Sequence, residues 1–160
     1  MKSFENLRDA GEKLAALVNA EYPQKPDVIL AVIPNGVPVA LPVGRELGLP
    51  VRGLPVRRTA DGPVVLEVPP VAGLRVIVID DGVETGAVAR VVAASLIKGG
   101  PASLTLAVPV CPRQSLAELG LRYDQIIAID KPLVHRSLAW HYLDFDTIDE
   151  TSALHLLAGQ

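Results

Sequence analysis

Apolar positions along the chain form two patterns, short continuous runs and longer stretches with helical spacing. The continuous runs predict strands buried on both faces, over residues 27–33, 51–56, 74–79, 104–110 and 125–129. The helical spacing predicts a first helix capped by Ser3 and ending before Pro23, and further helices over residues 37–47, 85–98, 114–119 and from about Thr147 onward. Residues 57–73 are the least regular, and their Asp-Gly-Pro turn predicts a loop or a small hairpin.

Strands that alternate with helices at this spacing predict an α/β fold with a mostly parallel twisted sheet and helices on both faces. In such sheets ligands bind beyond the carboxyl ends of the strands. With 160 residues, 49% of them hydrophobic, the chain can bury one core, so we expect a single domain over residues 1–160.

Charge and composition narrow the classes of ligand. The net charge is −3 and the sequence contains no basic stripe, so a nucleic-acid partner is not expected. No apolar run approaches the roughly 18 residues of a spanning helix, and no membrane partner is expected. The single cysteine, Cys111, allows no internal disulfide and fits a cytoplasmic location. A small molecule is the expected ligand.

One segment combines residues that suit a sugar phosphate. Asp80 and Asp81 end a buried strand and are followed by Gly82, Thr85 and Gly86 at the start of a helix. The glycines allow the backbone to approach a ligand closely, and the amides of the first helical turn attract an anion such as phosphate. The acidic pair would repel phosphate but suits sugar hydroxyls, or Mg²⁺ shared with them. The simpler alternative is a solvated turn that caps a helix.

The sequence VIVIDDGVETGA at residues 76–87 resembles the phosphoribosyl-pyrophosphate (PRPP) motif of type I phosphoribosyltransferases. Residues 8–11, 34–40, 107–110 and 142–145 resemble a bacterial branch of predicted phosphoribosyltransferases, so the similarity spans nearly the whole chain. It implies the type I fold with a small C-terminal hood, a homodimer, and transfer of 5-phosphoribose from PRPP to a nitrogenous base with release of pyrophosphate.

The resemblance also implies a role for each part of the site. Asp80 and Asp81 would hold the ribose 2- and 3-hydroxyls and a Mg²⁺ cofactor, the latter through those hydroxyls or water. The residues in contact with PRPP and its 5-phosphate would be Asp80, Asp81, Gly82, Val83, Glu84, Thr85, Gly86, Ala87 and Val88. The pyrophosphate loop would consist of Pro34, Asn35, Gly36 and Val37.

Glu84 resembles the acidic residue of the purine salvage members, where a carboxylate near the base acts as general base or acid. This extends the expectation to a purine acceptor and makes Glu84 the candidate catalytic residue. An acid favoured by the helix dipole is an equal alternative. In the hood, Trp140 and Tyr142 are candidates to stack on the base and Lys131 to read an exocyclic oxygen. Packing within the hood is the alternative for both aromatics.

Three features depart from the family pattern. Asn35 stands where the branch usually has arginine, and Val88 where many members have a hydroxyl residue. The lid that closes over the substrate has only residues 57–73 to draw on, with Arg57 and Arg58 as its charged residues. Asn35 and the short lid favour the alternative that the chain is a regulatory or sensor protein that binds PRPP or a nucleotide without turnover, whereas Glu84 favours catalysis. A dinucleotide-binding domain is set aside, because no Gly-x-Gly-x-x-Gly follows the first strand.

Overall fold

The computed structural model describes residues 2–160 and contains a six-stranded sheet. The strands lie in the order β3-β2-β1-β4-β5-β6, and all neighbours are parallel except β2 and β3. Their bounds are β1 (Val28–Ile33), β2 (Val51–Thr59), β3 (Gly62–Val65), β4 (Arg75–Ile79), β5 (Ser103–Val110) and β6 (Gln125–Asp130).

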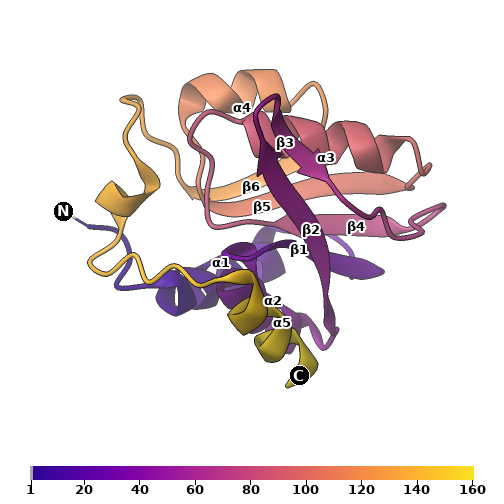
Figure 1. The fold of residues 1–160 in the computed structure, drawn as a ribbon, viewed down its shortest axis with the longest axis horizontal. Helices are drawn as coiled ribbons and strands as arrows, with labels where there is room; N and C mark the ends of the chain where they lie inside the picture. Colours follow the sequence, from indigo (N-terminus) through magenta and orange to yellow (C-terminus); the bar gives the residue numbers. More distant parts are fainter. Residues whose placement is uncertain (1) are drawn as a thin grey trace.

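Helices cover both faces of this sheet (Figure 1). One face carries α1 (Leu7–Glu21), α2 (Gly36–Leu47) and α5 (Glu150–Ala158), and the other carries α3 (Ala87–Ile97) and α4 (Arg113–Leu119). Within residues 2–160, no helix is both long enough and apolar enough to cross a membrane.

Successive residues of each central strand enter different cores, because side chains alternate between the two faces of a sheet. In β1, Ile29 and Ala31 pack in the core under α1 and α2, whereas Leu30 and Val32 pack in the core under α3. All six residues of β1 are buried. This explains why the central strands read as continuous apolar runs, and the predicted α/β fold with a mostly parallel sheet and helices on both faces is confirmed.

The irregular segment 57–73 forms part of a hairpin. Strand β2 continues past residue 56 to Thr59, and β3 returns antiparallel to it, with Arg58 opposite Pro63. Val56 and Val65 pack against the core under α3. The hairpin is therefore anchored by apolar contacts as well as by strand pairing.

The N-terminal helix begins later than predicted. Its cap is Asn6, whose side chain accepts a hydrogen bond from the Asp9 amide, and not Ser3. The amides of Ser3 and Phe4 instead donate to the His141 carbonyl at 3.1 Å, so this end of the chain is held in extended form against a distant segment.

The last helix also begins later, at Glu150 with Asp149 as its cap, and not near Thr147. Residues 131–149, called the hood from here on, connect β6 to this helix. They contain a short 3₁₀ helix, η1 (Leu138–His141), which the apolar pattern does not predict.

Candidate functional site

Asp80 and Asp81, called the acidic pair from here on, follow β4 directly at the carboxyl edge of the parallel strands. Both line a cavity of about 280 Å³ that extends along residues 82–88, called the phosphate loop. They also line a second cavity of about 330 Å³ on the side of Pro34 and Asn35. The acidic pair thus stands between two hollows, where the fold class places ligands.

The acidic pair is electrostatically unfavourable when no ligand is present. Burial and the neighbouring Asp81 carboxylate raise the pKa of Asp80 well above its usual range. Burial also raises the pKa of Asp81 to about 6. The Asp81 amide donates to Asp80 Oδ1 at 2.8 Å, so one carboxylate oxygen is held in place by the turn itself. Groups that donate hydrogen bonds or carry positive charge would relieve this arrangement.

The phosphate loop offers backbone donors beside the acidic pair. Gly82 and Gly86 adopt φ values of +144° and +86°, which favour glycine and turn the chain into the start of α3. Among residues 2–160, no acceptor is found for the backbone amides of Glu84, Thr85, Gly86 and Val88. Free amides at a helix start form an anion site.

Side chains brace this loop from two sides. Thr85 Oγ1 accepts a hydrogen bond from the Ala87 amide at 3.2 Å, which leaves its hydroxyl proton for another acceptor. Arg90 on α3 donates to the Thr85 carbonyl at 3.2 Å and forms an ion pair with Glu118 of α4 at 3.1 Å. Arg90 thus holds the phosphate loop in place from the side of α3 and α4.

The loop 34–37 lies next to the acidic pair in space. A Cβ added to Gly36 would come within 2.6 Å of the Ile79 carbonyl oxygen, so the two turns can lie this close only because residue 36 has no side chain. Pro34 and Asn35 line the second cavity, whereas Val37 is fully buried in the core. The structure therefore brings the first half of the expected pyrophosphate loop to the site.

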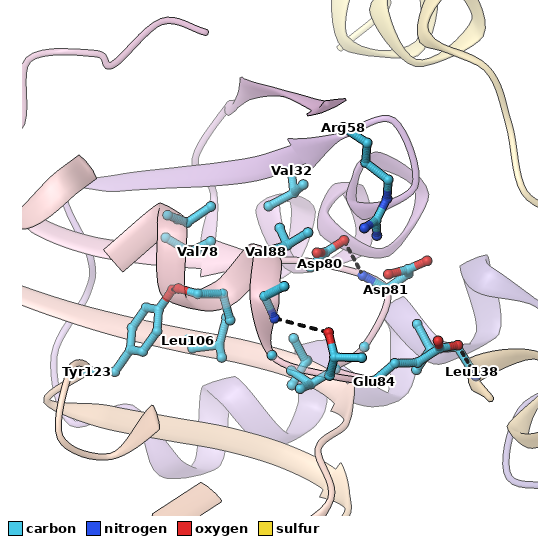
Figure 2. Close-up of a pocket in the computed structure, with 18 of the residues that line it drawn as sticks. Val32, Arg58, Val78, Asp80, Asp81, Glu84, Val88, Leu106, Tyr123 and Leu138 are labelled. Carbon is cyan, nitrogen blue, oxygen red and sulfur yellow. Dashed lines mark hydrogen bonds between the residues drawn. The ribbon is translucent and has the colours of Figure 1, made fainter. Parts of the chain in front are cut away.

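Asn35 has a structural partner in the hood. Its side-chain oxygen accepts a hydrogen bond from the Ile148 amide at 2.8 Å, across 113 residues of sequence. Arg58, at the end of the β2–β3 hairpin, reaches over the site from the other side and lines both cavities. Figure 2 shows its guanidinium directed toward the acidic pair.

Glu84 contacts the hood. Its Oε1 accepts a hydrogen bond from the Leu138 amide at 2.7 Å (Figure 2). Its carbonyl oxygen lies 2.9 Å from His135 Nε2. Leu138 packs over Gly82, where an added Cβ would approach its Cδ2 to 2.5 Å. The hood is thereby joined to the phosphate loop, and one oxygen of the Glu84 carboxylate is already used.

The structure does not bring the three expected hood residues to the cavity. Tyr142 is buried, with its ring 5.3 Å from Phe4 and 5.0 Å from Phe145, and its hydroxyl donates to the Asp81 carbonyl at 3.0 Å. Trp140 lies under Arg136, whose guanidinium carbon is 4.3 Å from the ring centre. Lys131 is exposed and outside the residues that line the cavities.

Leu138 and Phe145 are the hood residues that line the first cavity. The sequence motifs did not single them out, nor Arg90 or His135. A helical spacing of three or four residues after the Thr-Gly pair could have indicated Arg90 as a brace. Leu138 and Phe145 had no comparable signal, because their position depends on the irregular path of the hood.

Comparison with known proteins agrees with this geometry. A model of the phosphoribosyl transferase domain matches residues 2–132. The fold is similar to that of TT1426 from Thermus thermophilus, with a TM-score of 0.84 at 22% identity over 99% of both chains.

Two more distant structures share the fold. The purine phosphoribosyltransferase from Pyrococcus horikoshii Ot3 has a TM-score of 0.59 at 21% identity, over 84% of this chain and 97% of that one. A hypothetical protein from Neisseria gonorrhoeae with bound ppGpp has a TM-score of 0.61 at 15% identity, over 100% and 99%. With the acidic pair, the glycine-flanked turn and the free amides in the expected order, the chain belongs to the type I phosphoribosyltransferase family.

Proposed function

We propose that this chain transfers 5-phosphoribose from PRPP to a nitrogenous base and releases pyrophosphate. The observation that carries the proposal is the acidic pair at the end of β4, set between two cavities and followed by a phosphate loop with free amides. Membership of the family supports phosphoribosyl transfer in general.

The acidic pair would hold the sugar. Carboxylates of Asp80 and Asp81 accept hydrogen bonds from the ribose 2- and 3-hydroxyls, and these bonds offset the burial that raises the pKa of both groups. The 5-phosphate would then lie on the free amides of Glu84, Thr85, Gly86 and Val88, with the Thr85 hydroxyl as a further donor. Val88 offers no hydroxyl, so this phosphate gains one hydrogen bond fewer than in many relatives.

The residues present fit a magnesium ion. Magnesium prefers oxygen ligands and commonly takes one or two carboxylates together with substrate phosphates and water. Residues 2–160 contain no group of three or more acidic, His or Cys side chains able to hold a metal. The protein would therefore supply the acidic pair, directly or through ribose hydroxyls or water, and PRPP the remaining ligands. When bound, the ion would neutralise charge on the departing pyrophosphate.

The reaction requires one proton acceptor. The bond between C1 of the ribose and the pyrophosphate oxygen breaks with its electron pair, through an oxocarbenium-like transition state, and the base nitrogen forms the new bond to C1. The proton of that nitrogen is lost. We propose Glu84 as its acceptor: Oε1 is held by the Leu138 amide, and Oε2 is left to act as general base.

A purine is the acceptor that the site supports best. Leu138 and Phe145 give the hood side of the first cavity an apolar and an aromatic side chain, which suit a planar base. A carboxylate beside them suits an imidazole N–H. The similarity in fold to a purine phosphoribosyltransferase agrees with this choice. By family resemblance we also propose a cytoplasmic location and a homodimer, and light scattering of the purified protein tests the homodimer.

A non-catalytic nucleotide sensor is the second candidate. Asn35 is uncharged and bonded to Ile148, which weakens the case for strong pyrophosphate binding by the loop 34–37. The similarity in fold to a protein with bound ppGpp is compatible with this candidate. Such a protein would bind PRPP or nucleotides at the same acidic pair and phosphate loop without turnover.

The test is a turnover screen of PRPP and Mg²⁺ against purines, pyrimidines and related amides, read as pyrophosphate release, with calorimetry of PRPP binding. We expect turnover with at least one purine, and loss of binding in the double variant Asp80→Asn, Asp81→Asn. Binding without turnover on any base would favour the sensor. A folded wild type that binds neither PRPP nor a nucleoside monophosphate would refute both candidates.

A further inference from the structure

Three peptide units in the turn between β4 and α3 are held at their carbonyl oxygens by side chains from outside the turn. The pairs are Tyr142 Oη with the Asp81 carbonyl at 3.0 Å, His135 Nε2 with the Glu84 carbonyl at 2.9 Å, and Arg90 Nη1 with the Thr85 carbonyl at 3.2 Å. A carbonyl oxygen only accepts hydrogen bonds, so all three side chains donate, and His135 carries a proton on Nε2. The turn therefore depends on the hood and on α3 for these carbonyl partners.

The opposite end of each of these peptide units carries a free amide. These amides belong to Gly82, Thr85 and Gly86, and within residues 2–160 none of them has an acceptor. All three peptide bonds are trans, and the C=O and N–H groups of a planar trans peptide point in opposite directions. A side chain that fixes one of these carbonyls therefore also fixes the direction in which the amide points.

These contacts affect both the direction and the strength of the amide donors. Glycine at positions 82 and 86, with φ values of +144° and +86°, leaves the peptide units free to rotate unless other groups hold them. A hydrogen bond to the carbonyl also polarises the peptide unit, which strengthens its N–H as a donor by about 10–30%. A preorganised anion site requires donors that are both strong and correctly directed.

Two of the three side-chain donors are themselves held in place. Tyr142 is buried, and its ring centre lies 5.3 Å from that of Phe4 and 5.0 Å from that of Phe145. Arg90 forms an ion pair with Glu118 of α4 at 3.1 Å. None of the three donors is among the residues that line the cavities, so they act on a ligand through the turn rather than by direct contact.

We infer that Tyr142, His135 and Arg90 are positioning residues, which orient the free amides of the turn for an anionic ligand. Tyr142 sets the amide of Gly82, His135 sets that of Thr85, and Arg90 sets that of Gly86. The stacking role expected of Tyr142 is thereby replaced by a role in shaping the turn. The inference rests on the proposed function, because the anion in question is the 5-phosphate of the same substrate.

The experiment follows single amides of the isotope-labelled chain by NMR during titration with ribose 5-phosphate, which has the sugar and the phosphate but requires no turnover. In the wild type the amide protons of Gly82, Thr85 and Gly86 should shift on binding. Tyr142→Phe removes one hydroxyl and keeps the ring, so it should reduce the response at Gly82 most. It should also weaken ribose 5-phosphate by about 2- to 10-fold, the range for a lost neutral hydrogen bond.

The other two positioning residues have variants of their own. His135→Ala should reduce the response at Thr85, and His135→Gln should recover part of it, because the glutamine amide can donate in place of Nε2. Arg90→Ala should reduce the response at Gly86. The Glu84 amide is the reference, because it is free but, among the described residues, no side chain holds the carbonyl of its peptide unit. Its response should change least in every variant.

Tyr123→Phe is the matched control for Tyr142→Phe. Tyr123 is also buried, at the core end of the first cavity, and its hydroxyl donates to the Ala89 carbonyl at 2.7 Å. The amide of that peptide unit belongs to Arg90 and already donates to the Gly86 carbonyl at 2.9 Å, so no free amide depends on the bond. Both variants should lower the Tm, but only Tyr142→Phe should weaken ribose 5-phosphate.

Two results would contradict the inference and leave the proposed function standing. One is an unchanged response at Gly82 in Tyr142→Phe, and the other is an equal loss of affinity in both tyrosine variants. An equal loss at every amide in Arg90→Ala would show that the charge of Arg90, and not its position, acts on the ligand. If none of these amides responded in the folded wild type, the inference would be wrong, and absence of PRPP binding as well would refute the proposed function.

Discussion

Two turns follow neighbouring parallel strands and meet at the site, yet they use their side chains in opposite ways. The turn after β4 carries the acidic pair, and burial raises the pKa of both of its carboxyl groups. The turn after β1 carries Asn35, whose oxygen is satisfied by the Ile148 amide. Both turns retain free backbone amides. The first turn therefore holds buried carboxylates that suit a ligand but cost stability in its absence. In the second turn, the Asn35 side chain stabilises the fold through its hydrogen bond to the hood.

The hood contacts both of these turns. Residues 131–149 are attached to both of them, through Glu84 and the Leu138 amide on one side and through Asn35 and the Ile148 amide on the other. In the proposed reaction, a base beside Leu138 would therefore have to fit between a hood and a loop that already contact each other. We expect changes in the first turn to affect chemistry most, and changes in the second to affect stability most.

The largest effect is expected from Glu84→Gln. If Glu84 takes the proton of the base nitrogen, this change should lower kcat by roughly 10²- to 10⁴-fold and leave PRPP affinity nearly intact. The glutamine oxygen can still accept the hydrogen bond from the Leu138 amide, so the hood stays attached. Steady-state rates and PRPP calorimetry on the same protein provide the measurement.

Glu84→Ala is the companion variant, since it removes the contact to the hood as well as the base. It should lower the rate and also reduce protection of the hood in hydrogen exchange. An unchanged rate in Glu84→Gln, with a loss of about 0.3–1 kcal/mol in stability, would show that Glu84 serves only the helix dipole.

Gly36→Ala should have the next largest effect, because it drives the two turns apart. The added Cβ would lie 2.6 Å from the Ile79 carbonyl oxygen and 3.1 Å from the Asp80 Cα, both of them backbone atoms that cannot turn away. We expect a loss of about 1–3 kcal/mol in the free energy of unfolding, measured in urea, together with weaker PRPP binding.

Gly159→Ala provides the control, since its Cβ would find its nearest neighbours at an ordinary 3.7 Å. It should leave stability within about 0.5 kcal/mol of the wild type. Wild-type stability in Gly36→Ala would mean that the turns are not held as close together as described.

The sheet and the phosphate loop could be predicted from the sequence because their signals are local. The buried strands read as apolar runs, and the order of acids, glycines and threonine in residues 80–86 lies within one turn of chain. The contacts of the hood could not be predicted this way. Glu84 and Leu138 are 54 residues apart, and Asn35 and Ile148 are 113 apart, so no local pattern indicates either pair.

The positions of the aromatic side chains in the hood could not be predicted from the sequence either. Tyr142 was, with Trp140, an expected partner for the base, whereas Phe145, three residues further along, was not. The structure buries Tyr142 against Phe4, from the N-terminal segment, and leaves Phe145 at the cavity. Tyr142 is kept from the cavity by an N-terminal segment that pairs with the hood, and the helical spacing near Ser3 did not predict that segment.

Asp81→Asn should make the empty protein more stable at neutral pH. The folded pKa of Asp81 is about 6, above its ordinary 3.8, so the ionised carboxylate costs stability. That cost is absent below about pH 4, grows as the pH rises through about 4 to 6, and is complete above this range. Because a tenfold change in an acid dissociation constant corresponds to about 1.4 kcal/mol, the gain at pH 7.5 is on the order of 1–3 kcal/mol.

Thermal melts in EDTA at pH 7.5 and pH 4 measure this gain. For a chain of this size, each kcal/mol of stability shifts the Tm by about 2–4 °C. Asp124→Asn is unsuitable as a control, because its carboxylate accepts the Leu104 amide. Asp61→Asn, in the exposed turn of the hairpin, is suitable and should shift neither melt. An equal gain from Asp81→Asn at both pH values would show that ionisation is not the cause.

The smallest effects are expected at Asn35, and they separate its structural role from its place beside the second cavity. Asn35→Ala leaves the Ile148 amide without its acceptor and should cost about 0.5–1.5 kcal/mol of stability. Asn35→Asp keeps an acceptor oxygen, so it should preserve more stability than Asn35→Ala, but its charge should weaken PRPP binding.

Asn35→Arg loses the same acceptor yet places a cation beside the second cavity. It should therefore tighten PRPP more than a nucleoside monophosphate while melting at a lower temperature than the wild type. Equal changes in affinity for both ligands would show that the loop 34–37 does not face the diphosphate, and the contrast between the two turns would then rest on stability alone.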